Sequence, residues 1–139
     1  MLVAAFAATT AGRLAAQAPA DSLVLSCEAM DQDHRCTLYG TSVLQLIARP
    51  DLFDGKRVRV IGYIHWEFEG NALYVHAEDE RHSLNRNGLW VEMAATATPD
   101  SACQDRYVLV EGTFRARHHG HLGLWSGAIT GITRCMAWR

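Results

Sequence analysis

Five short segments of the chain alternate apolar and polar residues, and each alternation predicts a β-strand with one buried face. The first segment contains K-R-V-R-V-I-G-Y-I and the fourth contains R-Y-V-L-V-E-G-T-F. In each segment two valines at spacing two are followed, two residues later, by a glycine: Gly62 in the first and Gly112 in the fourth. Glycine weakens a strand unless the strand bends sharply or another backbone comes close. The predicted strands are residues 56–67, 72–77, 88–93, 106–116 and 123–134.

One helix is predicted ahead of these strands, over residues 42–49. Thr41 or Ser42 can cap its first turn, apolar residues recur at helical spacing, and Pro50 follows its end. The segments between the predicted elements are polar, charged or rich in small residues, which is typical of turns and loops. We therefore expect little regular structure in residues 21–40, 50–55, 78–87 and 94–105.

The bulk composition is that of one ordinary globular domain. The chain has 139 residues, of which 49% are hydrophobic and 20% charged, so it can bury a core and is not mainly disordered. Its formal net charge is −2, so no global positive field attracts nucleic acid or an anionic membrane surface. This balance weighs against nucleic acid as a partner and leaves open only a local basic groove.

The N-terminus is similar to a secretory signal peptide. Residues 1–11 are small and apolar, and residues 18–20 (Ala-Pro-Ala) fit the small-x-small pattern of a cleavage site, although no basic residue precedes the apolar run. That run is too short to span a bilayer as a permanent helix. We expect a signal-peptide-like segment at residues 1–20 and one domain at residues 21–139, and we expect the protein to be periplasmic or secreted.

Four cysteines in an exported chain suggest two disulfides, for which three pairings are possible. If the last two predicted strands form an antiparallel hairpin, Cys103 and Cys135 face each other at its open end. That leaves Cys27 to pair with Cys36. No two cysteines have the close spacing that zinc sites use. A lipoprotein hypothesis would instead place a lipid on Cys27.

Part of this pattern resembles a known fold family. The run P-x-x-F-x-G-K-x-V-x-V-x-G-Y, starting at Pro50, resembles small exported bacterial domains of the OB type. The run V-x-V-x-G-x-F, starting at Val108, resembles the fourth strand of anticodon-binding-like OB domains. The resemblance covers residues 42–134 and implies a mainly β fold, a five-stranded OB-like Greek-key barrel with one N-terminal helix. The matching residues are structural glycines and core valines, so the resemblance implies no catalytic residue.

On such a barrel, exposed rings of the second and third strands could stack on bases or sugars. Tyr74 and Trp90 are out of phase with the apolar residues of their strands, so we predict that they share a ligand-binding face with His76 and Glu92. Plain packing of the two rings is the alternative. The predicted partner is a protein, a glycan or a small ligand of the cell envelope, and an oligosaccharide or single-stranded nucleic acid is the alternative.

A second hypothesis concerns the histidines around Gly120. His118, His119 and His121 lie at a predicted hairpin tip, and imidazoles bind zinc, copper and nickel. A metal-binding periplasmic protein is therefore an alternative function. However, adjacent residues on a strand point to opposite faces, and a glycine-containing tip is an ordinary place for solvated polar residues.

Catalysis is not expected. Glu67 with Glu69, and Glu78 with Glu80, could share a face as paired acids for proton transfer, but such pairs are common on exposed turns. The chain contains no nucleophile motif and no glycine-rich phosphate loop. We therefore expect a binding module that is not an enzyme and that uses no cofactor.

Overall fold

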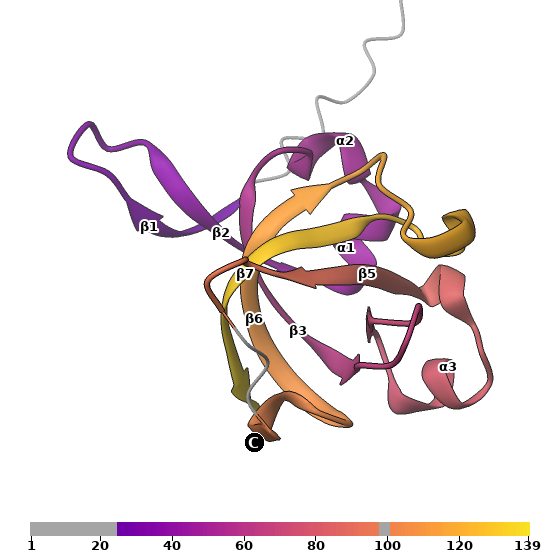
Figure 1. Cartoon of the computed structure of the whole chain (residues 1–139). Helices are drawn as coiled ribbons and strands as arrows, with labels where there is room; N and C mark the ends of the chain where they lie inside the picture. Colours follow the sequence, from indigo (N-terminus) through magenta and orange to yellow (C-terminus); the bar gives the residue numbers. More distant parts are fainter. Residues whose placement is uncertain (1–24, 98–100) are drawn as a thin grey trace, which may run out of the picture.

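The structure, a computed structural model, describes residues 25–97 and 101–139, and the predicted signal segment lies outside these ranges. The described residues contain seven strands in one continuous sheet (Figure 1). In chain order the strands are β1 Ser26–Met30, β2 Cys36–Ser42, β3 Arg57–His65, β4 Ala72–Tyr74, β5 Gly88–Met93, β6 Arg106–Arg115 and β7 Ala128–Ala137.

Five of these strands close into a barrel. The order is β3-β4-β5-β7-β6, and β6 pairs again with β3 to complete the circle. Within the barrel only β5 and β7 run parallel, and the other neighbours are antiparallel. The prediction of a mainly β, five-stranded barrel is confirmed, and β5 has the bounds that the alternation predicted.

Both predicted glycines lie where two backbones approach closely. At Gly62 one edge of β3 changes partner, because the four residues before it pair with β2 and the three after it pair with β4. A Cβ at Gly62 would lie 2.6 Å from the backbone oxygen of Tyr74. Gly112 lies at an irregularity in the β6–β7 pairing, where a Cβ would lie 2.7 Å from Cγ2 of Ile129. A side chain at either position would push neighbouring strands apart.

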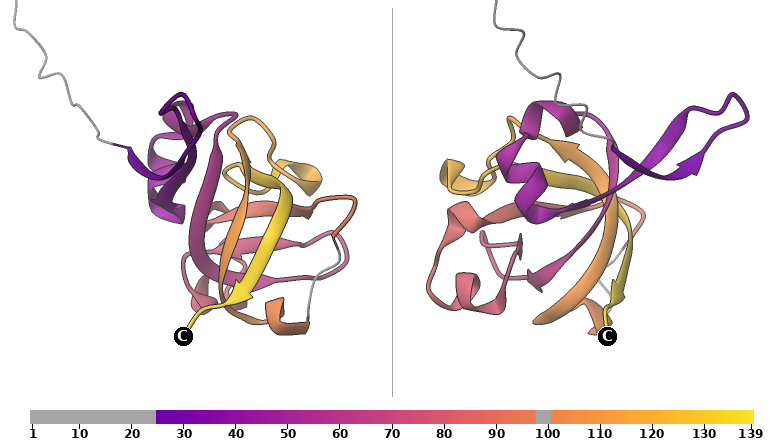
Figure 2. Two further views of the ribbon diagram at one scale, coloured as in Figure 1. Left: turned by 90° about the vertical axis from the view of Figure 1, so that its left-hand side faces the viewer. Right: turned by 180° about the vertical axis from the view of Figure 1, so that it is seen from behind.

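The prediction of little regular structure in residues 21–40 is wrong. β1 and β2 form an antiparallel hairpin that projects from the barrel (Figures 1 and 2). Most residues of β1 are exposed, so the strand has no buried face and no apolar alternation to reveal it. Cys27 and Cys36 form a disulfide across this hairpin, with their Cα atoms 5.7 Å apart. The sulfur of Cys27 is therefore not free for a lipid, which argues against the lipoprotein hypothesis.

The second predicted disulfide is also present. Cys103 and Cys135 are joined, with Cα atoms 6.2 Å apart, and link the segment before β6 to β7. Cys103 is fully buried in the main core. Both pairings derived from the strand arrangement are confirmed.

The described residues contain three short α-helices where the sequence predicted one: α1 Val43–Ala48, α2 Pro50–Phe53 and α3 Ala77–Arg81. α1 is the predicted helix, and the Ser42 hydroxyl accepts a hydrogen bond from the Gln45 backbone N–H at 3.2 Å. α2 replaces the predicted turn because Phe53 is buried in the barrel core. Short 3₁₀ turns also occur at Asn85–Asn87, Ser101–Cys103 and His121–Gly123.

α3 lies within the segment predicted to be a solvated loop. Asp79 is the reason, because its carboxylate accepts hydrogen bonds from the His76 backbone N–H at 2.9 Å and from Asn87 Nδ2 at 2.8 Å. These contacts bury an acidic residue that composition alone places in solvent. No helix in the described ranges is long and apolar enough to cross a bilayer.

Candidate functional site

The structure divides the four residues of the predicted binding face. Tyr74 is buried, and its hydroxyl lies 3.1 Å from Asn85 Oδ1. His76 precedes α3, is exposed, and has Nδ1 3.5 Å from the Tyr107 hydroxyl on another side of the barrel. Only Trp90 and Glu92 remain together, and Trp90 Nε1 donates to Glu92 Oε1 at 2.9 Å.

The connection between β6 and β7 explains why the aromatic face is not open. Trp125, from this connection, is buried against Ala72 and Tyr74, and its ring centroid lies 5.0 Å from that of Trp90 at a tilt of 59°. Gly120 packs so closely on the Trp90 indole that a Cβ there would lie 2.6 Å from Cδ2. Trp90 is therefore mainly a packing residue, and packing was the alternative interpretation of these rings.

Two of the three histidines attach this connection to other parts of the molecule, and the third contacts a residue of the connection itself. His118 Nε2 lies 2.9 Å from Glu92 Oε1 on β5, and His121 Nε2 lies 3.3 Å from Glu69 Oε2 in the β3–β4 connection. His119 Nδ1 lies 3.0 Å from the Trp125 carbonyl oxygen. In the part of the chain that is described, no three or more His, Cys, Asp or Glu side chains are arranged to hold a metal ion. The metal hypothesis gains no support from these contacts.

Two shallow hollows adjoin Glu92, and the two together are called here the Glu92 groove. One hollow, of about 540 Å³, lies toward the β3–β4 connection and is lined by Trp66, Glu67, Asn71, Val91, Glu92 and Met93. The other, of about 450 Å³, lies toward the β6–β7 connection and is lined by Asp54, Glu92, Arg115, Arg117, His118 and Thr130. Glu92 lines both, so it stands at the junction of the groove.

Some polar side chains of the Glu92 groove already have hydrogen-bond partners within the protein, and others do not. Glu92 Oε1 accepts from Trp90 and is in contact with His118, and Asp54 Oδ1 accepts from the Ala116 backbone N–H at 2.9 Å. Arg115 and Arg117 are exposed, and their side chains form no hydrogen bond or ion pair with any residue of the described ranges. The groove thus offers free guanidinium donors next to carboxylates that are held in place.

The four acids proposed as pairs from sequence each contact a basic side chain. Glu69 lies near His121, and Glu78 lies 2.6 Å from Arg81 Nη1. Glu67 and Glu80 instead meet across His65, at 3.5 and 3.9 Å from its Nε2. Glu69 and Glu80 thus contact residues distant in sequence, whereas Glu67 and Glu78 contact residues two and three positions away.

His65 has a third acidic neighbour, Asp105, which contacts its Nδ1. Burial disfavours the imidazolium, but the hydrogen bond to Asp105 and the charge of Glu80 outweigh burial and raise the pKa of His65. Hydrogen bonds from Gln104 and His65 lower the pKa of Asp105. This arrangement favours a charged pair at the end of β3.

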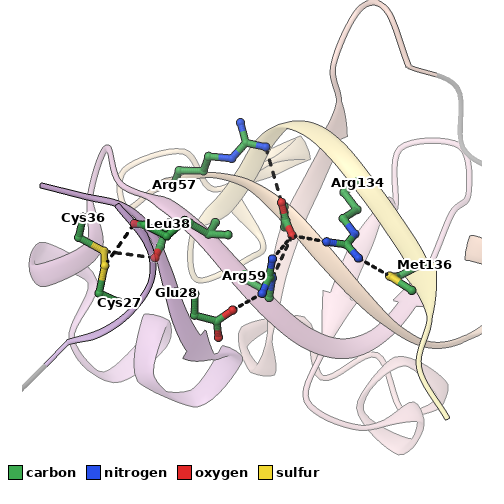
Figure 3. Close-up of polar contacts among 10 residues, drawn as sticks. Cys27, Glu28, Cys36, Leu38, Arg57, Arg59, Arg134 and Met136 are labelled. Carbon is green, nitrogen blue, oxygen red and sulfur yellow. Dashed lines mark hydrogen bonds and ion pairs between the residues drawn. A yellow bond between two sulfur atoms is a disulfide. The ribbon is translucent and has the colours of Figure 1, made fainter. Parts of the chain in front are cut away.

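Sequence reasoning missed a second ionic cluster, centred on Glu111. Its three arginines, Arg57, Arg59 and Arg134, are labelled in Figure 3. Glu111 Oε1 accepts from Arg59 Nη2 at 2.7 Å and from Arg134 Nη1 at 3.0 Å, and its Oε2 lies 3.8 Å from Arg57 Nη2. Arg59 also pairs with Glu28 of the projecting hairpin. The residues come from four strands, and their cross-strand register, rather than any local motif, brings them together.

The Glu111 cluster predicts that the folded protein loses stability at acidic pH. Burial opposes ionisation of Glu111, but hydrogen bonding and charge from Arg59 and Arg134 outweigh it and lower the pKa of Glu111. A carboxyl group whose pKa is lower in the folded state than in the unfolded state stabilises the fold at pH values above its unfolded-state pKa. That contribution is lost as the pH falls through its folded-state pKa. Urea unfolding of Glu111→Gln is therefore expected to give lower stability at pH 7, with the gap to wild type narrowing as the pH falls from about 5 to below the ordinary glutamate pKa of about 4.3. A gap that stays constant over that range would contradict the prediction.

Comparison with known proteins adds no family. No family model matches the chain, and no curated protein and no solved structure matches it. The function proposed below is therefore inferred from the geometry of the described residues.

Proposed function

We propose that this chain is an exported OB-type barrel that binds an oligosaccharide in the Glu92 groove and does not catalyse a reaction. The OB assignment is supported by the strand order and by the single parallel pair, β5 with β7, in an otherwise antiparallel five-stranded barrel. Export is supported by the two disulfides, which persist in oxidising compartments. The proposed location is the periplasm or the extracellular space.

One observation supports the proposed site above the others: Glu92 lies at the junction of two hollows on the third barrel strand. OB barrels bind oligonucleotides and oligosaccharides over their second and third strands and the loops after strands one and four. Here those strands are β4 and β5. The corresponding loops supply Glu67 and Asn71 on one side of Glu92, and Arg117 and His118 on the other.

The lining of the groove favours a sugar over a nucleic acid. Single-stranded nucleic acids need a positive track beside open aromatic rings. The groove instead contains three carboxylates, from Asp54, Glu67 and Glu92, which would repel phosphates. Carboxylate, amide and guanidinium groups together offer both acceptors and donors for hydroxyl groups. A sugar is the ligand class that uses both.

Glycan binding by the full chain tests this proposal. We expect binding to at least one member of an array of bacterial envelope oligosaccharides, followed by calorimetry on that glycan. Glu92→Gln should weaken the affinity by about tenfold or more, because it removes the charge at the centre of the site and replaces one acceptor oxygen by an NH2 donor. The matched control is Glu78→Gln, since Glu78 is exposed on α3 and lines neither hollow of the groove.

Three outcomes would contradict the proposal. One is the absence of binding across the array, and another is an equal loss of affinity in Glu92→Gln and Glu78→Gln. The third is preferential binding to the probe oligo(dT) with an affinity that falls steeply as salt increases, which would favour the nucleic-acid alternative.

A further inference from the structure

The outer face of β3, β6 and β7 carries side chains in rows that cross the three strands. Register places Arg59 opposite Glu111, and Glu111 opposite Arg134. The next row is apolar, with Ile61 opposite Leu109 and Leu109 opposite Met136. The outer face therefore changes from charged to apolar between one row and the next, which are two residues apart along each strand.

A third row extends the apolar region. Tyr63 and Tyr107 are cross-strand partners with ring centroids 5.7 Å apart, and the backbone N–H of Trp138 donates to the Tyr107 carbonyl. Trp138 also lines a hollow of about 360 Å³ together with Ile61 and Leu109. We call these six residues the apolar stripe: Ile61, Tyr63, Tyr107, Leu109, Met136 and Trp138.

Four of the six side chains of the apolar stripe are exposed, and Leu109, which pairs with Ile61 and Met136, is buried. Ile61 and Tyr107 are each 40% exposed, Met136 is 42% exposed and Trp138 is 50% exposed. Single exposed apolar residues are common, but a contiguous set across adjacent strands is typical of an interaction surface. None of the stripe residues lines the Glu92 groove, so this surface is separate from the proposed ligand site.

The two ends of the stripe carry opposite charge. At one end Arg57, Arg59 and Arg134 surround Glu111, and Glu28 also pairs with Arg59, which leaves one positive charge in excess. At the other end His65 is surrounded by the carboxylates of Glu67, Glu80 and Asp105. Along β3 the outward residues therefore run from a basic end, through an apolar centre, to an end bordered by acids.

We infer that the apolar stripe is the contact surface for a second copy of this chain, in a two-fold dimer. A two-fold axis that lies in the interface and crosses the strands between Ile61 and Tyr63 reverses the strand direction in the partner copy. The apolar rows then meet each other, and the basic end of each copy meets the acidic end of the other. Self-complementarity of this kind is what a symmetric interface requires.

Sedimentation velocity of the full chain over a range of concentrations tests this inference. The wild type is expected to convert from monomer to dimer as concentration rises. Trp138→Glu and Ile61→Glu each place a charge in the apolar centre and are expected to weaken dimerisation about tenfold or more. Trp138 follows the last strand, so its variant tests the interface even if Ile61→Glu folds poorly.

Leu44→Glu is the matched control, because Leu44 is 61% exposed on α1 and lies outside the stripe. It is expected to dimerise like the wild type. A wild type that stays monomeric at every concentration would overturn the inference. So would a dimer that tolerates both stripe variants, or one that Leu44→Glu weakens equally.

A second measurement separates charge pairing from apolar contact. Asp105→Asn removes one acidic-end charge at a residue with φ of 51°, a conformation that asparagine tolerates. We expect this variant to dimerise several-fold more weakly than the wild type at low salt and to depend less on salt. Equal salt dependence in both proteins would overturn the proposed two-fold arrangement.

Discussion

Replacing Cys103 and Cys135 together by alanine is expected to lower the free energy of unfolding by about 3–4 kcal/mol. The two residues are separated by 32 positions, so the disulfide closes a long loop in the unfolded chain and restricts its entropy. The bond also ties the segment before β6 to β7, and the carbonyl of Cys103 accepts from Trp66 Nε1 at 2.7 Å. Urea unfolding followed by tryptophan fluorescence would measure the loss.

The other disulfide supplies the comparison. Cys27 and Cys36 are only 9 positions apart and lie in the hairpin outside the barrel, so replacing both by alanine is expected to cost about 2.5 kcal/mol at most. Equal losses in the two double variants would show that loop length and position relative to the barrel do not determine the effect.

Gly62→Ala is expected to destabilise the barrel by about 2–3 kcal/mol, as overpacking at a closely packed position does. The added methyl group would lie 2.6 Å from the backbone oxygen of Tyr74 and 2.9 Å from Cγ of Leu73. A backbone oxygen in a paired strand cannot move unless β3 and β4 separate. Thermal and urea unfolding should both detect the loss.

Gly40→Ala offers the same chemical change with a different neighbour. A Cβ at Gly40 would meet the carboxylate end of Glu28, which is the far end of a flexible side chain and can move away. We expect a change within about 0.5 kcal/mol. If the two variants lost similar stability, the intrinsic cost of alanine in a strand, and not close approach of β4, would explain the result at Gly62.

The positions of some residues of the candidate site could be predicted from the sequence, and those of others could not. Alternation correctly placed Trp90 and Glu92 on the same face of β5, because side chains of one strand at spacing two share a face. It could not show that Trp125, far along the chain, would pack over Tyr74 and Trp90. The hollows beside Glu92 form where the β3–β4 and β6–β7 connections lie next to β5. A local sequence pattern cannot predict which connections lie next to each other.

Local sequence was sufficient wherever burial on one face, or a short-range cap, determined the structure. The period-two pattern located the five barrel strands, although β4 ends three residues before its predicted end and β7 begins five residues after its predicted start. The Ser42 cap defined the start of α1, and the strand arrangement led to the pairing of Cys103 with Cys135. The exposed hairpin β1–β2 escaped prediction because an unburied strand leaves no apolar period. α3 escaped because a charged segment was folded by the hydrogen bonds of Asp79.

Only the tertiary structure decided which polar groups are neighbours. Glu111 meets Arg59 and Arg134 because three strands align in register, and His65 meets Glu80 because α3 packs beside the end of β3. Strand formation depends on burial of nearby side chains, whereas ionic contacts and surface grooves depend on register and on chain segments distant in sequence. For this protein the residue pattern therefore determined the barrel, and barrel closure determined the Glu92 groove and the apolar stripe.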